Sequence, residues 1–405
     1  MTLNISTMTQ NFDQGILKIS CLVSTPEEKN RKLIYKIKTS HNDFIGPINA
    51  DWALIGLIYP AMAQGLSMNI NAPISQDLLF YVENDLQTLL MKINKNLKKI
   101  NITAKIIISC QEPIKNPGTA TGFSAGIDSF STLIINSKPN APNKITDLTV
   151  FNVGSFGKKK SPSQRKIIDR SFDRMKMYSK STNTNWFFVD TNLENFYAKL
   201  HRSGFQKTAT LRNASAALTL QSKISNYLYS SSVEYSQVSV VKTKKSYPNI
   251  EMGYIDPIIL PIISNHNMRF KSFGASYSRF EKVELVSNYE AAYQILDVCM
   301  AKPINRIEKV NCSACGKCMK TMLTLDILGK LDNFSKSFDL EKYNKSKRKY
   351  IKSLGAKSLL GENSINDLIK KLKKSSLYIK PSLLDYAKIL KSYIKKIHSY
   401  KIMEI

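Results

Sequence analysis

The sequence predicts an α/β fold: a doubly wound parallel sheet with an α/β domain before it and a basic helical region after it. Apolar stretches with the period of strands alternate with stretches of helical spacing between residues 113 and 334. The chain has 405 residues and is 43% apolar, which is enough for more than one core. Residues 335–405 hold 18 Lys or Arg and 6 Asp or Glu, a balance of 18 − 6 = +12, with helical periodicity. We therefore expect three parts: 1–112, 113–334 and 335–405.

The first part, 1–112, has mixed periodicity. Strands are predicted at 15–23, 32–37 and 101–109, and helices at 52–63 and 75–94. Ser75 is the expected N-cap of the second helix, because a serine side chain there can accept a hydrogen bond from the first helical turn. No pattern of catalytic residues stands out in this part. We expect it to support the next one.

The second part repeats the order strand, loop, helix. Strands are predicted at 120–123, 148–153, 186–189 and 237–241, and helices at 130–135, 163–178 and 211–229. This alternation is typical of parallel, doubly wound sheets, in which ligands bind at the carboxyl ends of the strands. The loops that follow the strands are therefore where functional residues are expected.

The formal net charge of +28 indicates a polyanionic partner, because clustered lysines and arginines bind phosphates and release counterions. The alternative is a composition rich in Lys, Asn, Ile and Ser that spreads charge over solvated faces. No run of about 20 uninterrupted apolar residues exists. The N-terminus lacks the pattern of a signal peptide. We expect a cytoplasmic protein with no membrane partner.

One loop has the composition of an anion-binding site. Ser124, Ala125, Gly126, Ile127, Asp128 and Ser129 lie between a predicted strand and a predicted helix. Small residues there let backbone N–H groups approach a phosphate, and the helix dipole favours negative charge. The loop lacks the Gly-Lys-Ser/Thr of a Walker A motif and the spaced glycines of a dinucleotide fingerprint. A helix start that binds no ligand is the alternative interpretation.

The same six residues resemble the Ser-Gly-Gly-x-Asp-Ser signature of PP-loop ATP pyrophosphatases, which split ATP between the α and β phosphates. Five of the six positions match. The resemblance implies that the loop binds ATP, that Ser124 and Ser129 donate hydroxyls to the phosphates, and that Asp128 holds Mg²⁺. Ala125 replaces the first glycine, which requires a backbone angle that alanine tolerates.

Two further strand exits are expected to contact the same nucleotide. Asn152, Val153 and Gly154 end the second strand, where this superfamily meets adenine and ribose, and Asp190 ends the third strand. The switch-point rule favours ligand contact at these positions. Polar strand exits occur in any α/β sheet, so a purely structural role stays open.

Four cysteines cluster near the end of the second part: Cys299, Cys312, Cys315 and Cys318. Four thiolates form a closed tetrahedral Zn²⁺ site, which is structural because no coordination position stays open. An iron–sulfur cluster is the alternative for such a dense set. Cys21 and Cys110 stand alone and are expected in cores.

The loop and the cysteine cluster together resemble the 7-cyano-7-deazaguanine synthases and their longer relatives in bacterial antiviral gene clusters. The resemblance spans about residues 115–330. It implies ATP-dependent adenylation of a 7-deazaguanine carboxylate, followed by formation of an amide and a nitrile or by transfer to a protein or nucleic acid. Arg279 and Lys282 are then the expected cationic contacts, and His201 a base or substrate contact. The oligomeric state, a homodimer included, stays open.

Two other functions fit the same motifs. A PP-loop enzyme that modifies tRNA is the first, although a thiolase needs a reactive cysteine outside the cluster. A nucleotide-binding or nucleic-acid-binding module without turnover is the second, and Ala125 favours it. Release of AMP and pyrophosphate distinguishes catalysis from binding, and dependence on tRNA distinguishes the two enzymes.

Overall fold

The computed structural model describes residues 1–47, 49–109, 114, 116–156, 162–198, 200, 204–241, 251–299, 309–359 and 365–391. The chain forms two compact units. The first contains Met1–Ser124 and Thr132–Ser276, and the second contains Ala125–Ser131 and Tyr277–Ile405. Helix α4 (Ile127–Asn136) contributes to both. None of the helices in the described part of the chain has the length and hydrophobicity that a bilayer crossing requires.

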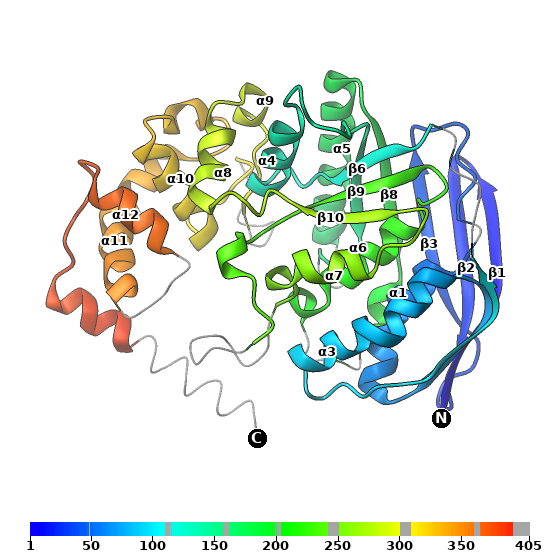
Figure 1. The fold of residues 1–405 in the computed structure, drawn as a ribbon. Coiled ribbons are helices and arrows are strands. Elements are labelled where there is room, and N and C mark those ends of the chain that lie inside the picture. Colours follow the sequence, from blue (N-terminus) through cyan, green and yellow to red (C-terminus); the bar gives the residue numbers. More distant parts are fainter. Residues whose placement is uncertain are drawn as a thin grey trace. The chain divides into compact units, whose positions relative to one another are not determined.

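The first unit is built on one sheet of ten strands (Figure 1). In chain order the strands are β1 (Thr2–Asp13), β2 (Ile16–Ser24), β3 (Arg31–Thr39), β4 (Ser67–Ser75), β5 (Ile102–Ile108), β6 (Gly118–Gly122), β7 (Asp147–Asn152), β8 (Asn185–Thr191), β9 (Ile224–Ser230) and β10 (Arg269–Phe273). Their order across the sheet is β10-β9-β6-β7-β8-β3-β2-β1-β4-β5. The sheet is mostly parallel, and only the β8–β3, β3–β2 and β2–β1 pairs are antiparallel.

The five strands β10-β9-β6-β7-β8 are all parallel and have the order of a doubly wound sheet. Strand β6 is central: the chain first adds β7 and β8 on one side of it and then β9 and β10 on the other. The order of the strands reverses at β6. The carboxyl ends of β6 and β9 therefore form the topological switch point, where such sheets bind ligands.

The remaining helices of the first unit connect these strands. They are α1 (Asp51–Gln64), α2 (Gln76–Tyr81), the π-helical η1 (Val82–Leu86), α3 (Gln87–Ile93), α5 (Pro162–Thr182), α6 (Ala209–Leu218) and α7 (Asp256–Ile262), with short 3₁₀ turns η2 (Leu193–Tyr197), η3 (Phe205–Lys207), η4 (Tyr235–Gln237) and η5 (Met252–Tyr254). Helices α1 and α6 pack side by side. A Cβ at Gly56 of α1 would lie 2.6 Å from Ser215 Oγ of α6, so only glycine permits this approach.

The first 124 residues share a sheet and a core with the parallel strands, so the division differs from the boundary expected at 112. The physical reason is the antiparallel ladder between β3 and β8, in which Tyr35 pairs with Thr191 and Thr39 with Phe187. Buried side chains of β2, β3, α1, β8 and α6 form one continuous hydrophobic cluster. The N-terminal strands extend the doubly wound sheet and have no separate core.

Two expected elements are wrong. The helix expected at 211–229 ends at Leu218, and residues Ile224–Ser230 form strand β9 between β6 and β10. The strand expected at 237–241 is absent there, because Tyr235–Gln237 is a 3₁₀ turn followed by irregular chain. The apolar residues of 224–229 suit a strand or a helix, and pairing with β6 makes this segment a strand.

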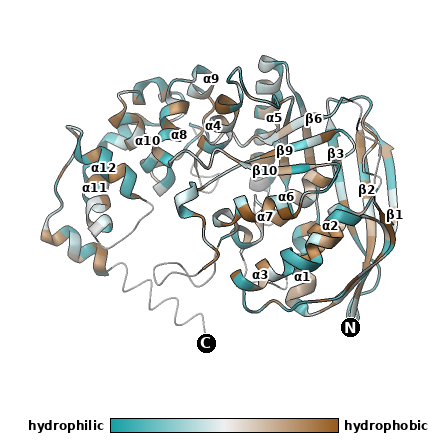
Figure 2. Cartoon of the chain, viewed as in Figure 1, coloured by the Kyte–Doolittle hydropathy of each residue, from teal (hydrophilic) through white to brown (hydrophobic). Residues whose placement is uncertain are grey.

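The second unit is helical in its described part. Its elements are α8 (Arg279–Ser287), α9 (Glu290–Tyr293), α10 (Gly316–Ile327), the turn η7 (Leu331–Phe334), α11 (Leu340–Leu359) and α12 (Asn366–Lys373). Phe280, Leu323, Ile351 and Leu368 are in one core, so α11 and α12 belong with α8 and α10, and the expected boundary at 334 does not coincide with the division. Figure 2 shows α12 in both brown and teal, since buried Leu368, Ile369 and Leu372 alternate with lysines.

Candidate functional site

The loop expected to bind phosphate leaves the central strand β6. Phe123 donates its N–H to Thr149 O of β7 at 2.8 Å, Ser124 follows, and α4 begins at Ile127. The loop thus has the strand–turn–helix context of an anion-binding turn, and it starts from the switch point of the sheet. Ala125 is buried and has a φ of +54°. The expectation that alanine tolerates its backbone angle is wrong: the left-handed conformation costs it about 1–2 kcal/mol, which glycine avoids.

Asp128 pairs with two cationic side chains, Arg279 and Lys282, that are about 150 residues away along the chain. Arg279 Nη1 lies 2.8 Å from both carboxylate oxygens of Asp128, and Lys282 Nζ lies 3.6 Å from Oδ1. Lys282 is buried. Burial opposes ionisation of Asp128, but the charges of Arg279 and Lys282 outweigh it and hold the pKa below its usual value. The structure therefore brings together three of the expected site residues in the second unit.

Local structure explains why Arg279 and Lys282 face the same carboxylate. Both lie on α8, three residues apart and so on one helical face. A capping box fixes the start of this helix: Ser278 Oγ accepts from Glu281 N, and Glu281 Oε2 accepts from Ser278 N at 2.7 Å. Lys317, on the first turn of α10, adds to the positive charge that lowers the pKa of Asp128. Four charged groups thus converge in this unit.

Ser129 is on the first turn of α4. Its hydroxyl is buried and donates to Gly126 O at 3.0 Å, which ties the turn to the helix. Ser131 makes the equivalent bond to Asp128 O at 2.9 Å. The hydroxyl of Ser129 therefore has an internal acceptor, and donation to a phosphate requires it to rotate.

The other expected contacts lie at the carboxyl ends of β7 and β8, in the first unit. Asn152 Nδ2 donates to Asp190 Oδ1 at 2.6 Å, so these two residues are brought together. Val153 is buried, and Gly154 has a φ of +98°, a conformation that favours glycine. His201 lies outside the described residues, as does Cys110.

The four cysteines of the second unit form a site that could hold a metal ion. All four sulfur atoms lie within 4.8 Å of one another. The sulfurs of Cys299 and Cys315 are 4.0 Å apart, and Cys318 lies 3.9 Å from Cys312 and 3.4 Å from Cys315. Zinc–sulfur bonds of about 2.3 Å in a tetrahedron give sulfur separations of about 3.8 Å, so the set fits zinc. Disulfide bonds need about 2.05 Å and do not fit.

Backbone groups support the sulfurs as they would support thiolates. Cys312 N points to Cys299 Sγ at 3.4 Å, and Cys315 N points to Cys312 Sγ at 3.3 Å. Contact with the other cysteines, and burial, raise the pKa of Cys318. Four sulfurs cannot all ionise side by side without a cation among them. The cluster therefore has the chemistry of a metal site, as the sequence predicted.

Two residues that sequence reasoning missed hold this cluster in place. Buried Asn311 donates to Leu296 O at 2.7 Å and to Ser337 O at 3.1 Å, and accepts from Val298 N at 2.9 Å. Asp297 Oδ1 accepts from Cys299 N at 3.1 Å, while Asp297 N donates to Ala125 O at 2.8 Å. Asp297 thus connects the first cysteine to the loop that the sequence predicts to bind phosphate. Both residues lie beside cysteines, which is a weak signal in the sequence.

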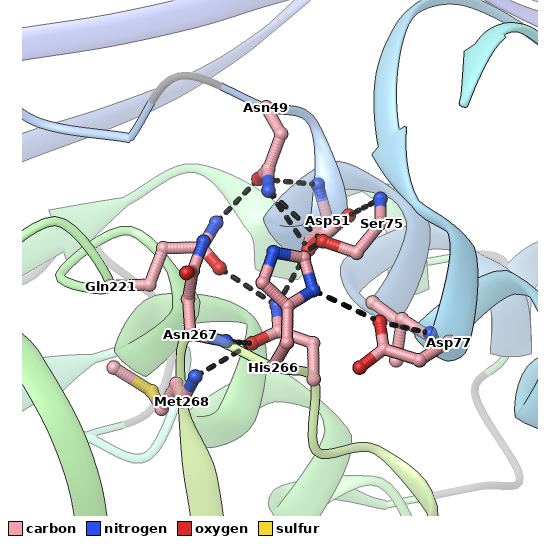
Figure 3. Close-up of polar contacts among 10 residues, drawn as sticks. Asn49, Asp51, Ser75, Asp77, Gln221, His266, Asn267 and Met268 are labelled. Carbon is pink, nitrogen blue, oxygen red and sulfur yellow. Dashed lines mark hydrogen bonds and ion pairs between the residues drawn. The ribbon is translucent and has the colours of Figure 1, made fainter. Parts of the chain in front are cut away.

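A second polar cluster, which we call the Asp51 network, was also missed. Figure 3 shows Asn49, Asp51, Ser75 and Gln221 pointing toward one another inside the first unit. Asp51 accepts hydrogen bonds from Asn49 Nδ2 at 3.0 Å, Ser75 N at 2.9 Å, Ser75 Oγ at 2.6 Å and Asn265 Nδ2 at 2.6 Å. Ser75 precedes α2, as expected, but its hydroxyl bonds to Asp51 and does not cap the helix. The sequence feature that could have indicated this network is Asp51 itself, an aspartate at the start of an apolar helix.

Comparisons with protein-family models, with curated proteins and with solved structures found no match for this chain. The features that bear on function are therefore the loop at the switch point, the charged groups on α8 and the cysteine cluster.

Proposed function

We propose that this protein splits ATP into AMP and pyrophosphate and uses it to adenylate a carboxylate, that of a 7-deazaguanine. One observation carries the proposal: a Ser-Ala-Gly-Ile-Asp-Ser loop leaves the central strand of a sheet with doubly wound order, at its switch point. A phosphate-binding loop belongs at this place in such a sheet. The identity of the carboxylate rests on the resemblance to deazaguanine synthases alone.

In this proposal the residues of the loop bind the phosphates. Ser124 and Ser129 supply hydroxyls, and Gly126 permits close approach of the backbone. Asp128 fits a Mg²⁺ ligand because its carboxylate is held ionised, although the ion must share it with Arg279. Bound Mg²⁺ would neutralise phosphate charge. Arg279 and Lys282 supply the positive charge that an ATP phosphate and a substrate carboxylate require when they meet.

The four cysteines would hold one structural Zn²⁺ ion. Asp297 accepts a hydrogen bond from Cys299 N and donates one to Ala125 O, so it links the cysteine cluster to the loop. The zinc would then stabilise the loop's conformation and take no part in the reaction.

The test is incubation with ATP, Mg²⁺ and 7-carboxy-7-deazaguanine. We expect AMP and pyrophosphate, and their release should depend on the carboxylate. Asp128→Asn should remove most of this turnover. Ser124→Ala and Ser129→Ala should each reduce it about ten- to hundredfold, since a charge-assisted contact contributes about 1.5–3 kcal/mol. Ser137→Ala, a serine just past the end of α4, is the matched control.

Other products would point to the alternatives. ADP would refute the proposal. AMP release that tRNA stimulates and the deazaguanine does not affect would favour a tRNA-modifying enzyme. ATP binding without turnover would favour a non-catalytic module, which the left-handed Ala125 in place of glycine also favours.

A further inference from the structure

Arg212, on the first turn of α6, is a buried arginine with little to bind. Only 7% of its surface is exposed. Nη1 donates to Val153 O at 3.4 Å, and the guanidinium lies 3.9 Å from the ring centre of Tyr197. Nε is buried and has no hydrogen-bond partner among the described residues. A guanidinium carries five N–H donors, so most of its capacity is unused.

Such an arrangement is unfavourable unless something else satisfies the charge. Burial lowers the pKa of Arg212, and the favourable charges of Tyr197 and Glu194 only partly compensate.

Arg212 lies near the carboxyl ends of the parallel strands, the edge at which doubly wound sheets bind ligands. Its partner Val153 directly follows β7, while Tyr197 and Glu194 are on the turn that follows β8. A Cβ at Gly154 would lie 2.9 Å from Arg212 Nη1. The same Cβ would lie 3.2 Å from Glu194 Oε2, so only glycine fits beside this guanidinium at the β7 exit.

We propose that Arg212 binds the anionic group, a carboxylate or a phosphate, of a small molecule that enters at the carboxyl ends of β7 and β8. The planar fork of a guanidinium matches either group with two parallel hydrogen bonds, and the unused donors are available for this. The site itself stands on the geometry of Arg212. Only the choice of ATP or a deazaguanine carboxylate as the ligand rests on the proposed function.

The test compares two ligand pairs by calorimetry, each with and without the anionic group. The pairs are ATP and adenosine, and 7-carboxy-7-deazaguanine and 7-deazaguanine. We expect Arg212→Met to weaken binding of the anionic member of one pair about ten- to hundredfold and to leave its neutral member unchanged. The pair affected identifies the group as phosphate or carboxylate. Lys223→Met, which removes the same charge from the surface pair with Asp43, is the control.

A second measurement separates ligand binding from packing. If Arg212 serves to bind a ligand, Arg212→Met should keep or raise the thermal unfolding midpoint of the ligand-free protein, because the variant removes an unsatisfied buried charge. A lower midpoint with unchanged preference for both anionic ligands would overturn the proposal. Should Arg212→Met not fold, Arg212→Lys keeps the charge and must still lose the anion preference. Loss of that preference without AMP formation would refute the proposed reaction and leave this site standing.

Discussion

The Asp51 network and the cysteine cluster each bring several polar side chains together, but they differ in how those groups are satisfied. In the Asp51 network, donors and acceptors balance: Asn265 bonds to both Asp51 and Gln221, and Gln221 bonds to Asn49. In the cysteine cluster, four sulfurs lie within 4.8 Å of one another, an arrangement that could hold a metal ion. The first arrangement is complete without a ligand, whereas the second offers four ligands to a cation. Balance of partners thus distinguishes a structural polar cluster from a binding site.

The largest effect should come from the cysteine cluster. We expect about one zinc per chain, and Cys315→Ser should abolish its binding and unfold the second unit, because metal binding and folding are coupled at such sites. Metal analysis and thermal unfolding with and without a chelator measure this. Cys21→Ala, which removes a buried lone thiol, should keep the metal. Iron with a visible absorption band, or normal stability without any metal, would contradict zinc at this site.

Next in size is the Asp51 network. Asp51→Ala should lower the free energy of unfolding by about 3–5 kcal/mol, because it leaves buried donors of Asn49, Ser75 and Asn265 without their acceptor. Chemical denaturation measures the loss. Asp77→Ala is the control, since Asp77 is partly exposed and pairs with His266 at 3.4 Å, and it should cost less than about 1 kcal/mol. Equal costs would mean that the network is not a structural unit.

Asp256 is a buried polar group with fewer partners than Asp51, and its effect on stability should depend on pH. It is buried and accepts one hydrogen bond, from Thr210 Oγ1 at 2.6 Å, and burial raises its pKa to about 7. The folded protein therefore keeps this proton to higher pH than the unfolded chain, whose pKa is about 3.9. The stability from this group is greatest below pH 4, falls between about pH 4 and 7, and is constant above.

Asp256→Asn should remove that decline, which amounts to at most about 4 kcal/mol by linkage. Denaturation midpoints at pH 4, 5.5 and 7.5 measure the difference between the variant and the parent. Asp43→Asn, on an exposed surface, should leave the decline in place. A parallel pH dependence in Asp256→Asn and the parent would assign the decline to other groups.

The smallest effect concerns Ala125. Ala125→Gly should stay within about 1 kcal/mol of the parent, because relief of the left-handed conformation is offset by a lost buried methyl and a more flexible unfolded chain. Ala125→Val should cost clearly more, since a β-branched residue resists a positive φ. Denaturant unfolding of the parent and both variants measures these differences. A valine variant as stable as the glycine variant would mean that residue 125 does not need a positive φ.

The doubly wound order of the parallel strands and the clustering of the cysteines could be predicted because each depends on a local pattern: alternating periodicity, and cysteines spaced three apart. The residues of the Asp51 network could not, because Asp51 and Asn265 are 214 positions apart and meet only through the fold. The burial of Arg212 could not be predicted for a related reason. A basic residue in a helix usually faces solvent, and only the packing of Tyr197 and Val153 around it reveals that it does not. Strand β9 was missed because its neighbours, β6 and β10, are distant in sequence.

The ladder between β3 and β8 has a consequence for the order of events during synthesis. Tyr35 pairs with Thr191, so a strand made early waits for 191 − 35 = 156 further residues before its partner exists. At roughly 5–20 residues per second this delay is about 8–30 seconds. A sheet of β1, β2 and β3 that formed in that interval would have an unpaired β3 edge. Such an edge can pair with other chains, so the newborn N-terminus needs protection until β8 leaves the ribosome.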